Sequence, residues 1–254
     1  MRIAITRDVS PAIARCELTH LAREPIDLDR ARAEHTEYEK RLADLGCDVQ
    51  ALPAEPDLPD SVFVEDAAVV LPELAIITRP GAESRRPETA SIAEALAPYR
   101  TMIAIEAPGT IDGGDVLVVD RTVYIGRSER TNENAIAQFR AALAPHGYTV
   151  IPVTLSGCLH LKSAVGLVGP GTLLINRDWA DASAFDGLRM IDVDPGEPRA
   201  ACALLVGDTV VYPAGFDRTR ARLTRAGIRA VVVPVSELAK AESGVTCCSL
   251  IFDT

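Results

Sequence analysis

The feature that most constrains the fold is an internal repeat that runs through the whole chain. Five short apolar runs, rich in aliphatic or β-branched residues and bounded by polar residues, proline or glycine, open similar units. A polar loop, a helical pattern and a second apolar run follow each opening run, and a third run leads into the next unit. The opening runs are residues 3–5, 75–77, 123–125, 173–175 and 210–212.

Helical patterns lie between the first and second runs of each unit. Asp27 is a candidate N-cap of the first helix, and Gly46 is a candidate stop just after it. The predicted helices span about residues 27–45, 87–99, 128–145, 181–185 and 217–227, of which the fourth is short.

The second and third runs of each unit are also predicted to be strands. The second runs are residues 49–53, 103–108, 150–153, 190–193 and 231–235. The third runs are residues 62–70, 116–119, 164–168, 202–206 and 249–252. Because the fifth unit has no sequel, we expect the N-terminal strand at residues 3–5 to complete it.

Units of this kind cannot bury their apolar strand faces alone, so they must pack against one another. In a ring, five of them form a five-bladed α/β propeller of ββαβ-type repeats, which we predict as a single domain over residues 1–254. A doubly wound parallel sheet is the alternative, because strands alternate with helices. It ranks lower because each unit has an extra strand and no glycine-rich phosphate loop follows the first strand; Gly113 and Gly114 precede a strand instead.

Composition excludes several classes of protein. With 48% hydrophobic and 24% charged residues, the chain has the make-up of a globular protein. A net charge of -10 argues against nucleic acid and anionic membranes as partners. The N-terminus is too short and polar for a signal peptide, and no apolar run approaches the roughly 20 residues of a membrane span. The six scattered cysteines predict free thiols in a reducing cytoplasm, and no cysteine or histidine motif predicts a structural metal.

Polar residues gather at one equivalent place, the loop or strand start that follows the second run of each unit. Units one, two, three and five place residues 60–66, Asp112, His160 and Cys247 there. The corresponding residues 200–202 of unit four include no acid or base. In a ring these positions converge near the axis, which predicts one central site.

Cys247 and Cys248 stand side by side, and a free cysteine most often simply packs in a core. The place of Cys247 in the repeat makes it a candidate nucleophile, because His160 is the only histidine at an equivalent position. We therefore predict His160 as a general acid/base. Cys248 is a rival nucleophile, which strand alternation would place on the opposite face.

The acidic run at residues 60–66 is interspersed with Val62 and Val64 and followed by the apolar residues 67–71, so its surroundings are too apolar for a solvated strand. Strand alternation would point Phe63 and Glu65 to one face and Asp60 and Asp66 to the other. Buried carboxylates need partners or a cationic ligand, and several acids around one cysteine suit a guanidinium group.

Two arginines, Arg85 and Arg130, follow the first strands of units two and three at matching places. Single surface arginines usually face solvent, but the match predicts a shared grip on a carboxylate. The loop at residues 8–25 is the longest of its kind and is a candidate lid.

With these residues assembled, the chain resembles the dimethylarginine dimethylaminohydrolase family of the pentein superfamily, whose members modify guanidino groups. The resemblance covers essentially the whole chain and depends on a combination of strings that are weak singly. The matching strings are residues 59–66, 77–82, 84–86, 112–116, 130–132, 159–163 and 246–249. The fold of that superfamily is a five-bladed α/β propeller, in agreement with the repeat.

The resemblance implies a role for each matching residue. The catalytic residues are implied to be Cys247 as nucleophile, His160 as general acid/base and Asp112 as the acid that orients the histidine or pairs with the guanidinium. The family pattern favours Cys247 over Cys248. Some family members carry glutamate where this chain has Asp112, so the contact made by the shorter side chain is open.

A second group is implied to bind substrate. Asp60 and Asp66 are guanidinium partners with Phe63 and Glu65 beside them, Arg85 and Arg130 hold the α-carboxylate, and Leu18 is a lid residue whose backbone contacts the amino group. The lid around Leu18 matches the family only loosely.

The implied reaction is hydrolysis of Nω-methylated L-arginine to L-citrulline and methylamine or dimethylamine, through an S-alkylthiouronium on Cys247. No cofactor is required, and zinc is expected only as an inhibitor at Cys247 and His160. The implied partner is this small-molecule substrate, and the resemblance is compatible with a homodimer.

Alternatives remain open. The same residues could serve an arginine or agmatine deiminase or an amidinotransferase, or a decayed propeller that binds arginine-like ligands or a partner protein without catalysis. Arg85 and Arg130 favour an amino acid over agmatine, and the inserted helical domain expected of arginine deiminases is missing. Intact Cys247, His160 and Asp112 argue against decay. The preferred methylated arginine stays undetermined.

Overall fold

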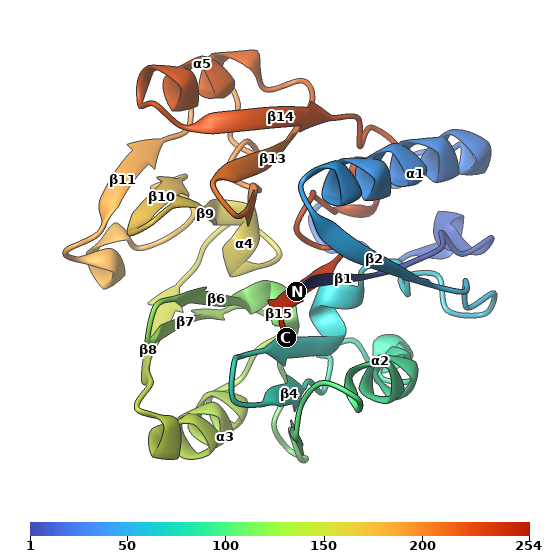
Figure 1. Cartoon of the computed structure of the whole chain (residues 1–254), viewed down its shortest axis with the longest axis vertical. Helices are drawn as coiled ribbons and strands as arrows, with labels where there is room; N and C mark the ends of the chain where they lie inside the picture. The colour runs from blue at the N-terminus through green and yellow to red at the C-terminus, as the bar shows by residue number, and fades with distance from the viewer.

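The computed structural model describes residues 1–254 as five three-stranded sheets arranged in a ring (Figure 1). Each sheet has the same order: an inner strand pairs antiparallel with a middle strand, which pairs parallel with an outer strand. The predicted five-bladed α/β propeller is confirmed. The doubly wound alternative is wrong, because no sheet joins more than three strands.

The strands fall into three sets according to their place in the sheet. The inner strands are β3 (Ala68–Val70), β6 (Val116–Val119), β9 (Val165–Gly169), β12 (Leu204–Val206) and β15 (Leu250–Asp253). The middle strands are β1 (Arg2–Arg7), β4 (Ala75–Ile77), β7 (Thr122–Arg127), β10 (Thr172–Ile175) and β13 (Thr209–Pro213). The outer strands are β2 (Cys47–Leu52), β5 (Met102–Ala104), β8 (Thr149–Thr154), β11 (Arg189–Asp192) and β14 (Arg229–Val233).

A helical segment joins the middle strand of each sheet to its parallel outer strand, as a parallel connection requires. These segments are α1 (Leu28–Asp44), α2 (Glu88–Leu96), α3 (Glu133–Leu143), the 3-10 turn η6 (Ala182–Phe185) and α5 (Asp217–Arg225). The Asp27 side chain caps α1 by accepting the N–H of Arg30, and Gly46 follows the helix with a φ of 88°. The third helix begins later than predicted, because Asn132 caps it through the N–H of Ala135.

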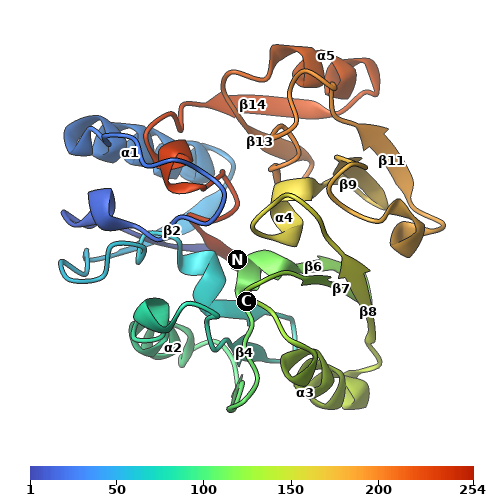
Figure 2. The same cartoon turned by 180° about the vertical axis from the view of Figure 1, so that it is seen from behind.

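The ring closes where the two ends of the chain meet. Strand β15 pairs antiparallel with β1 from Arg2 opposite Asp253 to Ile5 opposite Leu250, which confirms that the N-terminal strand completes the fifth unit. Arg2 and Asp253 also form an ion pair of 2.9 Å. The termini therefore lie side by side in both views of the ring (Figures 1 and 2).

The strand predicted over residues 62–70 is wrong in its first half. Residues Val64–Ala67 form the 3-10 turn η2, all four residues are buried, and only Ala68–Val70 is a strand. The period-two alternation predicted for the acidic run does not apply there. Tertiary contacts hold the turn: Gly114 donates its N–H to the Asp66 carboxylate, and Thr78 donates its hydroxyl to the Asp66 carbonyl.

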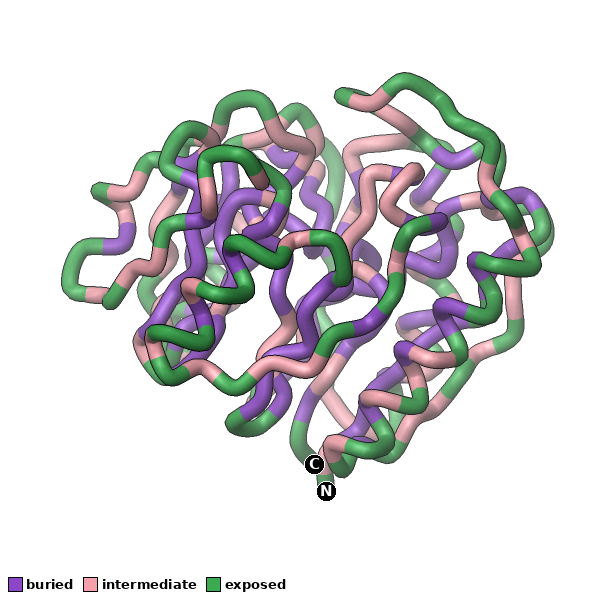
Figure 3. The backbone as a smooth tube through the Cα atoms, turned by 90° about the horizontal axis from the view of Figure 1, so that it is seen from above, coloured by how far each residue is buried: buried purple, intermediate pink, exposed green.

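The degree of burial depends on the place of an element in the ring. The inner and middle strands are mostly buried, whereas loops and the outer faces of the helices are exposed (Figure 3). None of the helices combines the length and the apolarity that crossing a bilayer requires. The ends of the inner strands therefore meet in a buried centre of the ring. Polar side chains there can form hydrogen bonds with residues of neighbouring units, as Asp66 does with Gly114.

Candidate active site

Four chemically active side chains come from turns that lie just before inner strands. Asp66 lies in η2, and Asp112 directly precedes the 3-10 turn η4 (Gly113–Asp115). His160 directly precedes the short helix α4 (Leu161–Ala164), and Cys247 lies in the turn before β15. These are the equivalent positions of four units. The ring brings them together across separations of up to 181 residues in sequence, from Asp66 to Cys247.

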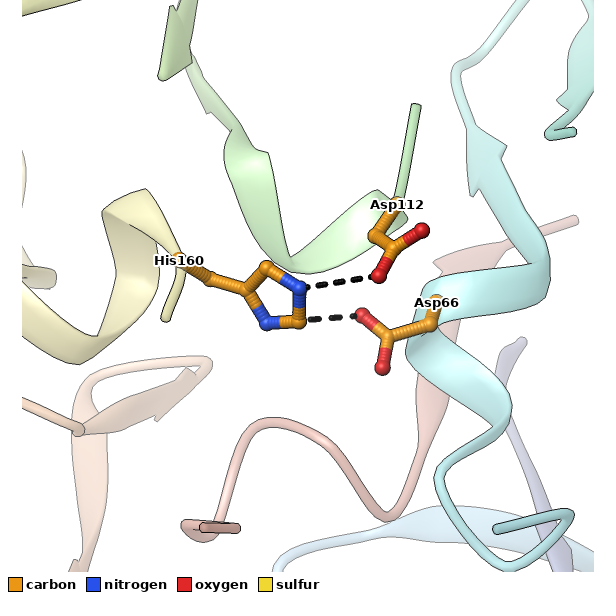
Figure 4. Close-up of side chains that lie close together, drawn as sticks. All are labelled: Asp66, Asp112 and His160. Carbon is orange, nitrogen blue, oxygen red and sulfur yellow. Dashed lines mark hydrogen bonds and ion pairs between the residues drawn. The ribbon is translucent and has the colours of Figure 1, made fainter. Parts of the chain in front are cut away.

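His160 faces two carboxylates that lie on the same side of its ring (Figure 4). Its Nε2 is 3.0 Å from Asp112 Oδ2, and its Nδ1 is 3.9 Å from Asp66 Oδ1. Asp112 is itself fully buried and accepts the N–H of Gly81 on its other oxygen at 2.9 Å. The shorter acid at Asp112 therefore reaches the histidine directly, as the orienting role requires.

Close packing around the histidine depends on Gly113 and Gly114. A Cβ at Gly114 would lie 2.6 Å from His160 Nδ1 and 2.8 Å from Asp66 Oδ1, and one at Gly113 would lie 2.0 Å from the Glu65 carbonyl oxygen. The two glycines therefore let the backbone approach the imidazole of His160 and the acidic turn.

The charges around His160 and Asp66 favour a protonated imidazole beside an ionised carboxylate. Burial lowers the pKa of His160, but Asp66 and the hydrogen bond with Asp112 outweigh burial and raise it to about 9. Burial raises the pKa of Asp66, but His160 and Arg85 outweigh it and lower it to about 2. At neutral pH, His160 therefore carries the proton that a general acid needs.

The two neighbouring cysteines differ in environment. Cys247 is partly exposed and accepts the N–H of Gly244 at 3.5 Å, whereas Cys248 is 2% exposed and packs in the apolar core. Both lie in a turn, so the predicted strand alternation is not what separates them. Contact with Cys202 and burial raise the pKa of Cys247 well above its usual value. Residue Cys202, in the unit that has no acid or base, also lies beside Thr246, 3.4 Å from its hydroxyl.

The raised pKa predicts low reactivity of Cys247 in the substrate-free protein. Because the thiolate is the nucleophile, iodoacetamide should alkylate Cys247 slowly at neutral pH. The rate should rise continuously as alkaline pH removes the thiol proton, as followed by mass spectrometry of the Cys247 peptide. The Cys247→Ser variant identifies the signal, and a rate that has already reached its plateau at neutral pH would contradict the prediction.

Two adjoining cavities are lined by both Cys247 and His160. The larger, of about 380 Å³, includes Cys247, His160, Glu65, Lys162 and Cys202 in its lining. A small cavity of about 20 Å³ brings predicted binding residues to the same two side chains. Its lining includes Asp60, Phe63, Asp66, Arg85, Arg130, His160 and Cys247.

Glu65 and Lys162 stand between the active-site cavity and a second cavity on the propeller axis. Lys162 Nζ lies 2.8 Å from Glu65 Oε1, and both residues, with Thr246, line the two cavities. Glu65 Oε2 is buried and has no hydrogen-bond partner. A buried acceptor of this kind is costly unless a donor meets it, so a cationic ligand fits here.

The site contains more buried acids than it can pair. Burial is the main cause that raises the pKa of Asp60 and Glu65, and it raises the pKa of Glu88 to about 7. Carboxylates held at such a cost are stabilised by an added positive charge. The buried acids around the cavities are Asp60, Glu65, Asp66, Glu88, Asp112 and Asp115.

The two predicted arginines are placed differently. Arg85 is 5% exposed and is not the solvent-facing side chain that a single surface arginine usually is; it pairs with Asp66 at 2.6 Å and Glu88 at 2.9 Å. Arg130 has looser contacts, with Nη1 3.9 Å from Asp112 and Nη2 donating to Thr19 at 3.1 Å. Arg130 therefore has more donor capacity for a ligand.

The predicted lid lies against the site. Its Glu17 N–H donates to Asp60 at 3.1 Å, and His20 and Leu21 line the larger cavity. Leu18 is half-buried against the core and lines neither cavity.

Sequence reasoning gave no role to Asp115, the second acid of the string at residues 112–116. Its carboxylate accepts from Leu161 N at 2.9 Å, from Thr131 Oγ1 at 2.6 Å and from the Ser128 hydroxyl. It thus joins the loop that carries Arg130 to the segment that carries His160. Burial raises the pKa of Asp115 to about 6. The signal was the second acid of this string.

Replacing Asp115 with asparagine should lower turnover while the protein stays folded. The amide can still accept from Leu161 but loses the charge that favours imidazolium, so kcat should fall about 10- to 100-fold, the effect of one charge-assisted hydrogen bond. The pH–rate profile should shift to lower pH, because protonated His160 loses a stabilising charge. Thermal unfolding checks folding, and an unchanged profile with normal kcat would remove the positioning role.

The same groups offer a set of cation ligands. One atom each from Asp66, Asp112 and His160 lies within 4.8 Å of the others. A metal would have to displace the proton that His160 holds with a pKa of about 9, which disfavours binding at neutral pH.

Comparison with known proteins gives one consistent match. The family described as N,N dimethylarginine dimethylhydrolase, eukaryotic, matches residues 19–181. An N(G),N(G)-dimethylarginine dimethylaminohydrolase from Streptomyces coelicolor is 40% identical over 248 residues, which cover 97% of this chain and 95% of that protein. The protein of that name from Pseudomonas aeruginosa is 38% identical over 89% of this chain and 90% of its own length.

Solved structures agree with this match. The Pseudomonas aeruginosa enzyme, as a Cys-to-Ser variant in complex with citrulline, superposes with a TM-score of 0.93 at 36% identity, covering 98% of both chains. The N-terminal domain of the cyanobacterial arginine dihydrolase ArgZ superposes with a TM-score of 0.85 at 17% identity, covering 98% of this chain and 97% of that one. The second likeness shows a shared fold.

Proposed function

Because the chain belongs to the dimethylarginine dimethylaminohydrolase family, we propose that it hydrolyses Nω-methylated L-arginine to L-citrulline and methylamine or dimethylamine. It is then a hydrolase that cleaves a C–N bond of a linear amidine. The structure of the Pseudomonas aeruginosa relative with citrulline and that of a His-to-Gly dimethylarginine dimethylaminohydrolase as an adduct with S-methyl-L-thiocitrulline support this chemistry.

One observation carries the proposal: a cavity that is lined by Cys247 and His160 is also lined by Glu65, whose buried Oε2 has no hydrogen-bond partner. Asp60 and Asp66 border the adjoining cavity. A guanidinium presents planar N–H donors and a positive charge, which suit the unpartnered Glu65 oxygen and the neighbouring carboxylates. The ligand therefore satisfies the acceptors and brings its central carbon to the thiol.

The reaction has two displacements at that carbon. The bound cation and imidazolium His160 favour loss of the Cys247 proton to solvent, and the thiolate attacks the central carbon. His160 gives its proton to the methylated nitrogen as the C–N bond breaks, which leaves an S-alkylthiouronium. Neutral His160 then takes a proton from water, whose oxygen adds to the carbon. The C–S bond breaks as the added hydroxyl gives its proton to the departing sulfur, which releases citrulline and restores the Cys247 thiol.

Each remaining residue has a binding or orienting role. Asp112 keeps His160 oriented through its 3.0 Å contact, and Phe63 borders the small cavity as an apolar wall. Arg130 and Arg85 attract the α-carboxylate. The backbone at Leu18 meets the amino group from the lid.

A product assay tests the proposal. Purified protein is incubated separately with Nω,Nω-dimethyl-L-arginine, Nω-methyl-L-arginine, L-arginine and agmatine, and citrulline and released amines are quantified. Citrulline from the methylated substrates with little from arginine supports it. Strong turnover of arginine or agmatine with ammonia release would indicate a deiminase, and transfer to an added amine an amidinotransferase. Ligand binding without any turnover would indicate a binding protein.

The same proposal extends to the setting of the enzyme. The whole chain, residues 1–254, would act as a single catalytic domain that requires no cofactor, with zinc as an inhibitor through Cys247 and His160. The six free cysteines fit a reducing cytoplasm. A homodimer is the expected assembly, which sedimentation or light scattering would measure.

A further inference from the structure

Glu242 is one of two non-glycine residues in a left-handed backbone conformation, with a φ of 57°. It follows the 3-10 turn Leu238–Ala241 and lies beside the catalytic groups in both active-site cavities. Side chains other than glycine, asparagine and aspartate rarely adopt this conformation, and such residues cluster at functional sites. A tertiary contact must therefore hold Glu242 there.

That contact is with the lid. Glu242 Oε2 accepts the N–H of Thr19 at 2.9 Å, and Oε1 accepts those of His20 at 2.5 Å and of Leu21. Three successive backbone N–H groups thus converge on one carboxylate, which is the arrangement of an anion nest. The partners are more than 220 residues apart, yet the N-terminal loop and the segment before β15 lie side by side (Figure 2).

The other contacts of the lid lead to predicted substrate-binding residues. The Glu17 N–H donates to Asp60 at 3.1 Å, and Arg130 donates to Thr19 Oγ1 at 3.1 Å. A ligand that engages Asp60 and Arg130 competes for these two contacts. The three contacts of Glu242 with the lid involve neither Asp60 nor Arg130, so they do not depend on those two residues.

Glu242 also adjoins the nucleophile. Ser243 and Gly244 follow it, and the Gly244 N–H donates to Cys247 Sγ at 3.5 Å. One residue thus ties the lid to the turn that carries the attacking sulfur.

We propose that Glu242 is a positioning residue that holds residues 17–21 of the lid over the cavity of Cys247 and His160, and we call this contact the latch. Without the latch, the lid exchanges between closed and open positions, and the substrate loses contacts made by the closed lid. The chemical groups stay in place. The kinetic consequence, a raised KM with little change in kcat, depends on the proposed hydrolase function.

Two variants separate the carboxylate from the backbone conformation. Glu242→Gln keeps the side-chain length but removes the charge, whereas Glu242→Gly removes the side chain and suits a positive φ. Glu24→Gln is the matched control, since it changes the same charge at an exposed position of the same loop, outside residues 17–21.

The direct measurement is amide hydrogen exchange at Thr19, His20 and Leu21 in the substrate-free proteins. We expect exchange to accelerate about tenfold or more in both Glu242 variants, the effect of losing a charge-assisted hydrogen bond. Glu24→Gln should match wild type. Exchange in Glu242→Gln at the wild-type rate would overturn the latch, and this holds whether or not the protein hydrolyses methylarginine.

The kinetic measurement tests the link to catalysis. In Glu242→Gln, KM should rise about tenfold while kcat stays within about threefold, since uniform binding is lost. An equal fall of kcat and kcat/KM would contradict the positioning role and place Glu242 in the chemical step. A change in Glu242→Gly alone would assign the effect to the backbone, which also overturns the latch.

Discussion

Replacing Cys247 with serine is expected to abolish hydrolysis, with a fall in kcat of roughly ten-thousandfold or more, as for other nucleophile deletions. A serine hydroxyl ionises far less readily than a thiol and has no adjacent base, because His160 is held protonated with a pKa of about 9. The pocket keeps its carboxylates and arginines. Citrulline and dimethylarginine should therefore still bind, which calorimetry can measure beside the citrulline assay.

Cys248→Ser is the matched control for this substitution. Cys248 is 2% exposed, faces the core and contacts the Gly244 carbonyl at 3.9 Å. Burial raises the pKa of its thiol to about 12. Turnover should stay near that of wild type, with some loss of thermal stability. Loss of activity in Cys248→Ser together with an active Cys247→Ser would reverse the assignment of the nucleophile.

Replacing His160 with glycine is expected to stop turnover of dimethylarginine and to trap a covalent adduct with a substrate that needs no proton for departure. Amines leave poorly without a proton, and His160 is the donor in the proposed mechanism. S-methyl-L-thiocitrulline instead releases methanethiolate, a weaker base. Its carbon should bond to Cys247, and the adduct should persist because no imidazole activates water.

Intact-mass spectrometry measures the adduct, and peptide mapping places it. The double variant that also carries Cys247→Ser should show no mass increase. Rapid hydrolysis of the adduct in His160→Gly would contradict the role of His160 as the base of the second displacement. Normal turnover of dimethylarginine would contradict its role as the acid of the first.

The local pattern of apolar runs and breakers predicted most of the fold. The opening and second runs became middle and outer strands, since short aliphatic runs between breakers suit buried strands wherever they occur. The closure of the ring by β15 and β1 followed from the lack of a sequel to the fifth unit. Repeat position also predicted which turns would converge on the axis.

Local pattern failed where a distant unit sets the backbone. Residues 64–67 were predicted as part of a strand because apolar residues flank the two acids, but the Gly114 N–H, supplied from the second unit, holds Asp66 in a 3-10 turn. The different burial of Cys247 and Cys248 likewise depends on the turn that contains both and on the core against which Cys248 packs. Strand alternation, which the sequence suggested, is not its cause.

The sequence by itself determined the propeller, because the residue pattern of each repeat specifies its strands and helix. Each repeat must then bury their apolar faces against its neighbours. It also determined which chemistry stands at each equivalent turn. Only the tertiary structure decided the pairing of charges: His160 with Asp112, Glu65 with Lys162, and Glu242 with the lid. Those partners are 48, 97 and 223 residues apart, and no local pattern encodes a contact whose geometry depends on how whole units pack.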